Sequence, residues 1–449
     1  MFDCNHLNVI LLLSTINKVF ASKELNLRIF YTFLYYSLIP LIVLRLLFKS
    51  LRNPAYRARL KERFGLFQVP TALSGGLWIH SVSVGETVAA AHLINRLLDI
   101  YPDLQITVTT MTPAGSDRVL TLLKGKVFHT YVPYDIPFAL NRFLRKVRPI
   151  VVIVMETEIW PNLLHCCQGQ KIPVILANAR LSARSASKYS KLPRFTKALL
   201  NQLTLIIAQN TIDAKRYINL GASPDKVTVI GNLKFNQQLP ENIHQAAKPL
   251  KRMWSKRKVW VVASTHQGEE EIILTAFKKI KQCIPEILLV LVPRHPERFK
   301  KVTHLCRAQG YQVQERSDCT QNNSKIDIFI VDTMGELLIF YATADLAFIG
   351  GSLVQVGGHN FLEAAALGVA MITGPYVFNF AEISAMLEQA QGLIKIENES
   401  TLAKKVIELM TDDEQRITIG RNAMSVVEKN RGEIMKAYLS ILNKILSAK

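Results

Sequence analysis

The sequence predicts an α/β protein with two Rossmann-like halves and an apolar segment near its amino terminus. Short apolar runs alternate with helical patterns from about residue 75 onwards, as in parallel sheets built from βαβ units. A polar, proline-containing stretch at 234–249 interrupts this alternation, which then resumes. The chain has 449 residues, too many for one ordinary hydrophobic core, so two domains are expected.

The chain is strongly basic. Hydrophobic residues make up 49% of the sequence and charged residues 20%, which describes a globular protein and excludes a disordered one. The formal net charge of +20 indicates an acidic partner, which can be nucleic acid, an anionic membrane surface or a phosphorylated substrate. The six cysteines lack the spacing of a metal site, and we interpret them as reduced packing residues.

The first element is an apolar segment at 29–44, sixteen uncharged residues between Arg28 and Arg45. It is slightly shorter than the roughly 20 residues of a membrane span, and Pro40 interrupts it. No signal-peptide cleavage site follows it. A basic block comes next, with one acid, Glu62, among the cations Arg45, Lys49, Arg52, Arg57, Arg59, Lys61 and Arg63. By the positive-inside rule, these features predict a membrane anchor whose basic flank holds anionic headgroups, with the remaining chain in the cytoplasm.

The expected strands fall into two sets. Those of the first half are 77–84, 106–111, 151–155, 174–179, 205–209 and 227–231. Those of the second half are 259–264, 287–292, 326–331, 347–349 and 371–373. Ligands bind open α/β sheets at the carboxyl ends of the strands. We therefore expect two Rossmann-like domains that face each other, with these ends bordering a common cleft.

Several common motifs are absent from the sequence. It contains neither G-x-G-x-x-G nor G-x-x-x-x-G-K-[ST], which argues against a dinucleotide enzyme and a P-loop kinase. No Asp-x-Asp pair lies at an expected strand end, so no metal ligands for a bridged diphosphate are expected. The cations cluster beside an apolar segment and no nucleic-acid-binding motif is visible, so we expect no nucleic-acid partner.

Carboxylates stand at two expected strand ends of the first half. Glu86 lies in HSVSVGET (80–87), where a strand gives way through a glycine to a helical pattern. Such a corner suits a ligand, but a carboxylate in a first helical turn also stabilises the helix dipole without further function. Glu156 and Glu158 follow directly on the apolar run at 151–154, where the alternative is a solvated loop.

The second half carries a cation and an imidazole, Arg294 and His295, at the end of one strand. The guanidinium fork of an arginine suits phosphate or carboxylate, although an exposed arginine often has no such function. In the turn VDTMGE (331–336), Met334 is available to pack on a flat base.

The most informative stretch is glycine-rich and lies at 349–364. Its two glycine pairs permit a ligand to approach the backbone closely, and His359 and Asn360 are expected to open a helix whose N–H groups can hold an anion. Glu363 either caps that helix or accepts a hydrogen bond from a ribose diol.

A second basic run lies in the first half, at 180–197, and contains six cations and no acid. Such a run usually forms a solvated face. Near a membrane anchor it also suits a phosphorylated lipid, and the candidates for binding that lipid are Arg184, Lys188 and Lys191.

Together, these residues resemble one family, the 3-deoxy-D-manno-octulosonic acid (Kdo) transferases of lipopolysaccharide synthesis. The matching motifs are HSVSVGE (80–86), METEIWPN (155–162), GNLKF (231–235), VPRHPERF (292–299), VDTMGE (331–336) and GGSLVQVGGHNFLE (350–363). The resemblance covers the chain from about residue 25 to its end. It implies a GT-B glycosyltransferase that moves Kdo from CMP-Kdo to lipid IVA, a lipid A precursor, at the cytoplasmic face of the bacterial inner membrane.

The resemblance also implies roles for single residues. Glu86 corresponds to the general base, and Glu156 and Lys234 correspond to groups that stabilise the transition state. Beside His359 of the glycine-rich loop, the candidates for CMP binding are Arg294, His295, Met334, Gly335, Glu336, Asn360 and Glu363. Direct displacement activated by one base implies inversion at the anomeric carbon. We expect no metal and no cofactor, with cations and helix N-termini supporting the departing CMP.

The expected domains follow from these assignments. They are a possible extension at 1–24, an apolar membrane anchor at 25–48, an acceptor-binding domain at 49–236, a linker at 237–250 and a CMP-sugar-binding domain at 251–449. The expected partners are CMP-Kdo, lipid IVA and anionic inner-membrane lipids.

Two alternatives to this function remain. Another GT-B nucleotide-sugar enzyme, a UDP-sugar transferase or an epimerase, would share the architecture. A non-catalytic membrane protein that binds anionic lipid would share the anchor and the basic surface. The same catalytic groups serve the transfer of one, two or more Kdo residues, and the apolar segment suits either a span or an interfacial helix.

Overall fold

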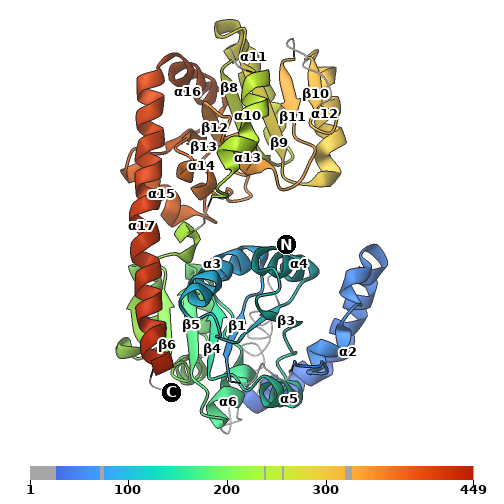
Figure 1. Cartoon of the computed structure of the whole chain (residues 1–449), viewed down its shortest axis with the longest axis vertical. Helices are drawn as coiled ribbons and strands as arrows, with labels where there is room; N and C mark the ends of the chain where they lie inside the picture. Colours follow the sequence, from blue (N-terminus) through green and yellow to red (C-terminus); the bar gives the residue numbers. More distant parts are fainter. Residues whose placement is uncertain (1–26, 71–74, 237–238, 255–256, 319–325, 448–449) are drawn as a thin grey trace. The chain divides into compact units, whose positions relative to one another are not determined.

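Figure 1 shows the computed structural model of the chain, which describes residues 27–70, 75–236, 239–254, 257–318 and 326–447. The described residues fall into two compact units. The first unit comprises the residues up to Asn236 together with those from Glu433 on, and the second unit comprises the residues between them. The expected extension at 1–24 lies outside the described residues.

The first unit is built on a parallel sheet of seven strands in the order β3-β2-β1-β4-β5-β6-β7. β1 pairs with both β2 and β4, so the strand order reverses between β1 and β4, and a ligand crevice is expected at their carboxyl ends. The strands are β1 Leu77–His80, β2 Ile106–Thr110, β3 Phe128–Tyr131, β4 Val151–Met155, β5 Val174–Ala179, β6 Leu205–Ala208 and β7 Val227–Val229.

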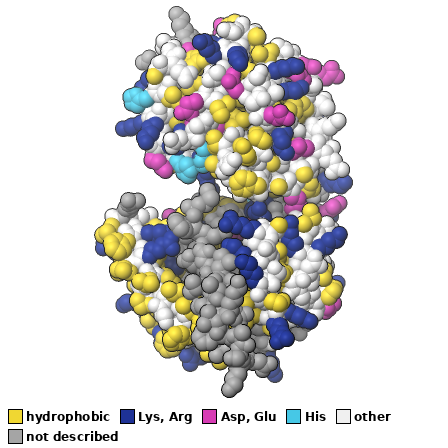
Figure 2. Space-filling model, turned by 180° about the vertical axis from the view of Figure 1, so that it is seen from behind, with side chains coloured by type: hydrophobic (Ala, Val, Ile, Leu, Met, Phe, Trp, Pro, Cys, Tyr) yellow, Lys and Arg dark blue, Asp and Glu magenta, His cyan; other side chains and the backbone are white. Residues whose placement is uncertain are grey.

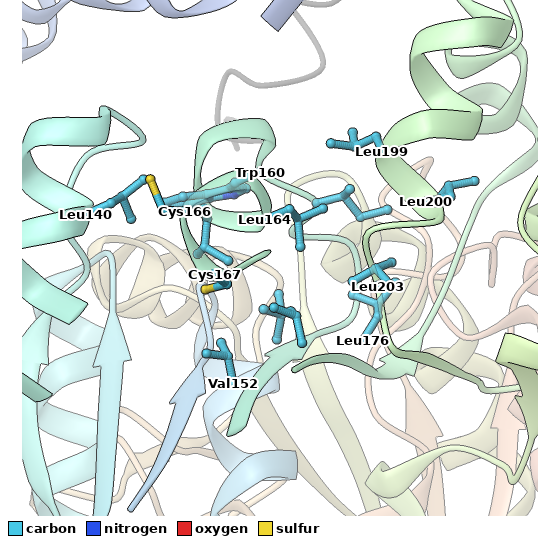
Figure 3. Packing of buried hydrophobic residues seen from close by; sticks show 14 of the residues in the cluster. Leu140, Val152, Trp160, Leu164, Cys166, Cys167, Leu176, Leu199, Leu200 and Leu203 are labelled. Atoms are coloured by element: carbon cyan, nitrogen blue, oxygen red, sulfur yellow. The ribbon is translucent and has the colours of Figure 1, made fainter. Parts of the chain in front are cut away.

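Helices cover this sheet. Proline at the first position helps to fix where α4, α5, α6 and α8 begin. Figure 3 shows part of the core, in which Leu164 and Cys167 of α6 lie beside Val152 of β4 and Leu176 of β5. The helices are α3 Val84–Ile100, α4 Pro113–Leu123, α5 Pro137–Val147, α6 Pro161–Gly169, α7 Ala183–Tyr189, α8 Pro193–Leu200 and α9 Thr211–Asn219.

The second unit repeats this plan with a parallel sheet in the order β10-β11-β9-β8-β12-β13-β14. β8 pairs with both β9 and β12, which places the reversal of strand order between β8 and β12. The strands are β8 Val259–Thr265, β9 Leu288–Pro293, β10 Val313–Glu315, β11 Ile328–Ile330, β12 Leu346–Ile349, β13 Ala370–Thr373 and β14 Ile394–Lys395. The helices are α10 Ile243–Met253, α11 Glu269–Cys283, α12 Phe299–Ala308, α13 Leu337–Tyr341, α14 Leu362–Ala366, α15 Ala381–Gln389 and α16 Glu399–Thr411.

The chain ends in α17, Asp413–Ser447, which begins in the second unit. From Glu433 on, its residues belong to the first unit, where Ile434, Tyr438 and Leu442 are buried. These side chains are spaced by four and share one helix face, which explains why the helix end joins the first unit. The expected boundary, with all of 251–449 in the second domain, is therefore wrong at its end.

All eleven expected strands are present, and the structure adds three that the sequence did not predict. These are β3, β10 and β14, which are short and lie at or near a sheet edge. The linker expected at 237–250 is also different, because α10 occupies most of it. Ile243, Ala247 and Leu250 repeat at helical spacing and bury one face of α10, so this stretch is part of the second unit. Among the described cysteines, Cys166, Cys167 and Cys306 are buried as expected, but Cys283 is exposed.

The apolar segment forms one helix, α2, over Leu27–Arg52. It is longer than expected because Pro40 does not end it, and by length and composition it is able to cross a membrane. One side of its first turns is fixed to the first unit, since Oη of Tyr31 donates to Asp135 at 2.8 Å and Oγ1 of Thr32 donates to Asn162 at 2.9 Å.

Candidate functional site

The first strand-end corner is the turn from β1 into α3. Oγ of Ser83 caps α3 by accepting the N–H of Glu86 at 3.2 Å, and Oε2 of Glu86 accepts the N–H of Val82 at 2.8 Å. Glu86 therefore does stabilise the start of the helix, as the simpler interpretation of the sequence predicts. Glu86 is also almost fully buried, with 6% of its surface exposed, which a cap does not require.

Burial and neighbouring charge change the acidity of Glu86. Loss of hydration is the larger cause and the charges of Glu156 and Glu158 add to it, so the pKa of Glu86 rises from 4.5 to about 8. The hydrogen bond from the N–H of Val82 acts in the opposite direction. A carboxyl group that titrates near neutral pH can accept a proton in the way that a general base must.

Glu156 lies directly after β4, across the reversal of strand order from Glu86. Its backbone is left-handed, with φ of 56°, a conformation that costs about 1–3 kcal/mol for a residue other than glycine. Its Oε1 is 2.9 Å from Nζ of Lys234, which lies in the short helix η4, Leu233–Asn236. The structure thus brings the three predicted catalytic residues to the same end of the first sheet. Oε2 of Glu158 accepts a hydrogen bond from Trp160 at 2.8 Å, so this turn is not a solvated loop.

Asn178, at the end of β5, is a buried residue that sequence reasoning missed. It also has a left-handed backbone, with φ of 53°. Its Oδ1 accepts the N–H of Leu233 at 2.9 Å, and its Nδ2 donates to Oε1 of Glu156 at 3.5 Å. Its own N–H donates to Oη of Tyr438 in α17 at 2.7 Å. One side chain therefore links the two elements that carry the Glu156–Lys234 ion pair.

In the second unit, the glycine-rich loop follows β12, at the reversal of strand order between β8 and β12. Gly350 approaches β8 so closely that an added Cβ would lie 2.6 Å from the carbonyl oxygen of Ala263. Gly351 has φ of 67°, in the left-handed region that favours glycine. A side chain at either position would displace the loop from the sheet.

Glu269, at the start of α11, holds this loop and was also missed by sequence reasoning. Its carboxylate is fully buried and accepts four backbone N–H groups, three of them at 2.7–2.9 Å. Burial raises the pKa of Glu269, and these hydrogen bonds oppose the rise. The donors are the N–H groups of His266, Gly351, Ser352 and Leu353.

Three imidazoles meet beside the loop. Nε2 of His266 lies 2.8 Å from Nε2 of His359, and the ring of His295 is 5.2 Å from that of His266. Burial and then the charge of His266 lower the pKa of His359 to about 3. His359 is therefore neutral at pH 7, which allows one of the two facing nitrogens to donate and the other to accept.

Exposed groups surround this end of the second sheet. The side chains of Arg294 and His295 are exposed after β9, and Met334 is 58% exposed after β11. Arg316 donates two hydrogen bonds to the carboxylate of Glu336, at 2.9 and 3.2 Å. Although burial acts to raise it, the pKa of Glu336 is held below its ordinary value by Arg316 and Thr333. The predicted nucleotide residues therefore follow β9, β11 and β12, at the carboxyl end of one sheet.

The helix expected to open at His359 and Asn360 is short and starts two residues later, at Leu362. Oδ1 of Asn360 accepts the N–H of Leu362 at 3.1 Å, and Nδ2 of Asn360 donates to Oε1 of Glu363 at 3.1 Å. The expected start of the helix is therefore wrong, and anion binding by its N–H groups stays a prediction. The Asn360–Glu363 pair remains a candidate for polar contacts with a ligand.

The candidate acceptor residues lie on or just after α7 of the first unit. Arg184 and Lys191 are exposed and Lys188 is half-buried. No cluster of three or more potential metal ligands occurs among the residues that the structure describes.

Two family models match the chain. Residues 58–237 match the model described as 3-deoxy-D-manno-octulosonic-acid transferase (kdotransferase), and residues 264–426 match glycosyl transferases group 1.

Whole-chain relatives agree with these matches. The chain is 40% identical to the 3-deoxy-D-manno-octulosonic acid transferase of Haemophilus influenzae, over 92% of this chain and 99% of that protein. It is 32% identical to the corresponding transferase of Bordetella pertussis, over 81% of this chain and 86% of that protein. Among solved structures, UDP-GlcNAc 2-epimerase of Neisseria meningitidis is similar with a TM-score of 0.57 and 16% identity, covering 82% of this chain and all of that one. At that identity, the likeness shows a shared fold alone.

Proposed function

The chain belongs to the 3-deoxy-D-manno-octulosonic acid (Kdo) transferases, which are glycosyltransferases, and we propose that it transfers Kdo from CMP-Kdo to lipid IVA in lipopolysaccharide synthesis. Its two parallel-sheet units have the GT-B type of fold. The comparisons establish the family, and the proposed parts are the donor, the acceptor and the roles of individual residues.

The buried carboxylate of Glu86 is the observation that carries the proposal. A sugar hydroxyl has a pKa far above 7, so its attack on the anomeric carbon of Kdo needs a base that takes its proton. Glu86 lies at the carboxyl end of β1, where ligands of such sheets bind, and its raised pKa increases its affinity for that proton. Because one base activates the acceptor and no covalent sugar–enzyme step is involved, the reaction inverts the anomeric carbon.

Glu156 and Lys234 are the groups to which we assign stabilisation of the developing charge. Their ion pair is held in place by Asn178 through the strained turn after β4. Fixed charges that need no reorganisation stabilise a transition state more strongly than mobile ones. The proposed mechanism assigns no step to a metal or a cofactor.

CMP is proposed to bind at the carboxyl end of the second sheet. Arg294 presents an exposed guanidinium suited to the phosphate, and exposed Met334 offers a surface for the base. Glu336 is held by Arg316, and Glu363 is held by Asn360, so both carboxylates are oriented to accept ribose hydroxyls. His295, Gly335 and His359 complete the proposed nucleotide site.

The membrane location is part of the proposal. The apolar helix α2 and the basic residues after it support attachment of the enzyme to the cytoplasmic face of the inner membrane, with anionic lipids as partners. Arg184, Lys188 and Lys191 are assigned to the phosphates of lipid IVA.

Mass spectrometry of reaction products tests this function. The purified protein, CMP-Kdo and detergent-dispersed lipid IVA should give lipid IVA heavier by one or more Kdo residues, and the mass also reports their number. UDP-sugars in place of CMP-Kdo should give no product. Product from a UDP-sugar, or none from CMP-Kdo with an active relative run in parallel, would contradict the proposal.

A further inference from the structure

A cavity of about 600 Å³ lies in the first unit, just beyond the carboxyl end of α2. The chain leaves α2 through the short helix η1, Pro54–Tyr56, where the ring of Tyr56 lies 5.3 Å from Nζ of Lys49 in α2. The next residues form the short helix η2, Leu60–Phe64, which supplies part of the cavity wall. The cavity is therefore fixed next to the end of the apolar helix.

Two sides of α2 differ in their surroundings. Tyr31 is fully buried against the first unit, whereas Phe33, Phe48 and Leu51 are 70%, 64% and 79% exposed. Figure 2 shows hydrophobic side chains at the edge of the first unit that carries α2, with Lys and Arg side chains next to them. Large exposed apolar side chains along one helix are typical of contact with a membrane, and their row ends near the cavity.

The four cations at 57–63 in the basic block divide into two groups. Arg63 is buried and donates to the carbonyl of Met111 at 2.7 Å. Arg59 donates to Oε1 of Glu62 at 2.7 Å and to the carbonyl of His129 at 3.0 Å. Arg63 is therefore part of the fold, and Arg59, although it also lines the cavity, has its charge matched by Glu62.

Arg57 and Lys61 form the second group. Both are exposed at the cavity, and neither forms an ion pair with another residue in the described part of the chain. The carboxylate of Glu62 also lines the cavity, but its charge is matched by Arg59, and its Oε2 accepts the N–H of Tyr131 at 2.9 Å. Two positive charges therefore remain for an anionic ligand.

The walls of the cavity are partly apolar. Leu66 is 46% exposed there, and the rings of Phe67 and Phe128 pack with centroids 5.9 Å apart. Gln68 adds an exposed polar side chain. Two cations, an apolar wall and an amide beside a membrane-facing helix match a phosphate linked to an acyl-bearing glycerol.

We propose that this cavity binds the phosphate-bearing headgroup of an anionic bilayer phospholipid while the exposed side of α2 lies among the acyl chains. The inference rests on the proposed membrane location, and it adds a specific site to it. Arg57 and Lys61 contact the phosphate, and bound lipid fixes the depth and orientation of the first unit at the membrane.

Vesicle co-sedimentation of the full chain tests the site. Phosphatidylcholine vesicles with phosphatidylglycerol should bind the parent more tightly than vesicles of phosphatidylcholine alone. The double variant Arg57→Gln/Lys61→Gln should lose ~10–30-fold in affinity for the anionic vesicles, as expected for two charges near a membrane surface. Its binding to neutral vesicles should be unchanged. The matched control is Lys278→Gln/Lys404→Gln, which removes the same charge from exposed positions on α11 and α16 and should behave like the parent.

A third variant, Gln68→Trp, separates a site from a diffuse charge effect, because it fills the cavity without changing charge. It should also weaken binding to the anionic vesicles, with a thermal unfolding temperature close to that of the parent. Normal binding by Gln68→Trp would show that charge alone attracts the membrane, and the proposed site would be wrong.

Kdo transfer in detergent distinguishes this inference from the proposed function. All three variants should retain the kcat of the parent, since none of the substituted residues is assigned to the catalytic or nucleotide site. A raised KM for detergent-dispersed lipid IVA with normal vesicle binding would assign the cavity to the acceptor and overturn the inference. Loss of vesicle binding in a parent protein that transfers no Kdo would leave the lipid site standing and remove the proposed function.

Discussion

The carboxyl ends of the two sheets are built on the same plan of strands but present different surroundings to a ligand. In the first unit, burial and then the nearby charges of Glu156 and Glu158 raise the pKa of Glu86 to about 8. In the second unit, Arg294 and Met334 are exposed at the surface. One unit therefore adjusts the acidity of a carboxylate, while the other holds accessible groups at the proposed nucleotide site.

The means of support differ in the same way. At the end of the first sheet, the side-chain amide of Asn178 joins the turn after β4, which carries Glu156, to the segment that carries Lys234. In the second unit, the buried carboxylate of Glu269 holds the backbone of a glycine-rich loop. Neither Asn178 nor Glu269 is itself proposed to touch a substrate, but each holds a segment that carries a group proposed to do so.

The largest effect is expected from Glu86→Gln. The amide keeps the size of the side chain but cannot accept the acceptor's proton, so kcat should fall by ~10²–10⁴-fold. Steady-state kinetics with lipid IVA measures this, with circular dichroism as a folding control. A kcat within about threefold of that of the parent would show that Glu86 is not the general base.

A smaller effect is expected from Asn178→Gly. Glycine tolerates φ of 53° without strain, so this change removes the amide contacts and spares the backbone. Misplacement of Glu156 and Lys234 should lower kcat by ~10–100-fold. The KM for CMP-Kdo should change little, because the altered residue lies in the first unit. A lower thermal unfolding temperature and a changed KM, together with an unchanged kcat, would make Asn178 a purely structural residue.

Glu269→Gln should weaken CMP binding by about tenfold, the size expected when hydrogen bonds to a charged group are lost. One amide cannot accept the four N–H groups that the carboxylate accepts, so the loop should shift. Fluorescence or calorimetric titration with CMP measures the change. Glu271→Gln, at an exposed position of the same helix, is the control and should bind CMP normally. Identical affinity in the two variants would show that the loop does not depend on Glu269.

The smallest expected effect concerns stability against pH. Because the folded-state pKa of Glu86 is raised from 4.5 to about 8, the folded protein binds more protons than the unfolded chain between these values. The contribution of Glu86 is therefore fully present below pH 4.5 and is lost as pH rises towards 8. Thermal unfolding at pH 5 and pH 8 should show a smaller drop for Glu86→Gln than for the parent. Parallel curves for the two proteins would mean that Glu86 ionises normally.

Local sequence patterns predicted the parts of the site that depend on neighbours along the chain. Glu86 was predictable because an apolar run, a glycine and a helical pattern adjoin it, and Arg294 because it ends a strand. Asn178 was not, since its partners Leu233 and Tyr438 are 55 and 260 positions away. The only signal was one polar residue in an apolar strand.

The same reason applies to Glu269, which contacts Gly351 at a separation of 82 positions. The role of each residue in a cluster of charges also depends on contacts that the sequence does not show. The sequence groups Arg57 with Arg63, but only three-dimensional contacts show that Arg63 is buried against a carbonyl and Arg57 is exposed. The parts of the site that could not be predicted depend on contacts between residues far apart in the sequence, and the order of the strands in the sheet determines those contacts.

The central claim is that the first unit supplies the general base and the second unit binds CMP. Calorimetric titration of CMP into Glu86→Gln and Arg294→Ala tests this claim most directly. We expect Glu86→Gln to bind CMP with the affinity of the parent, and Arg294→Ala to bind it at least about tenfold more weakly because a charge-assisted contact is lost. Weakened binding in Glu86→Gln together with normal binding in Arg294→Ala would contradict this claim.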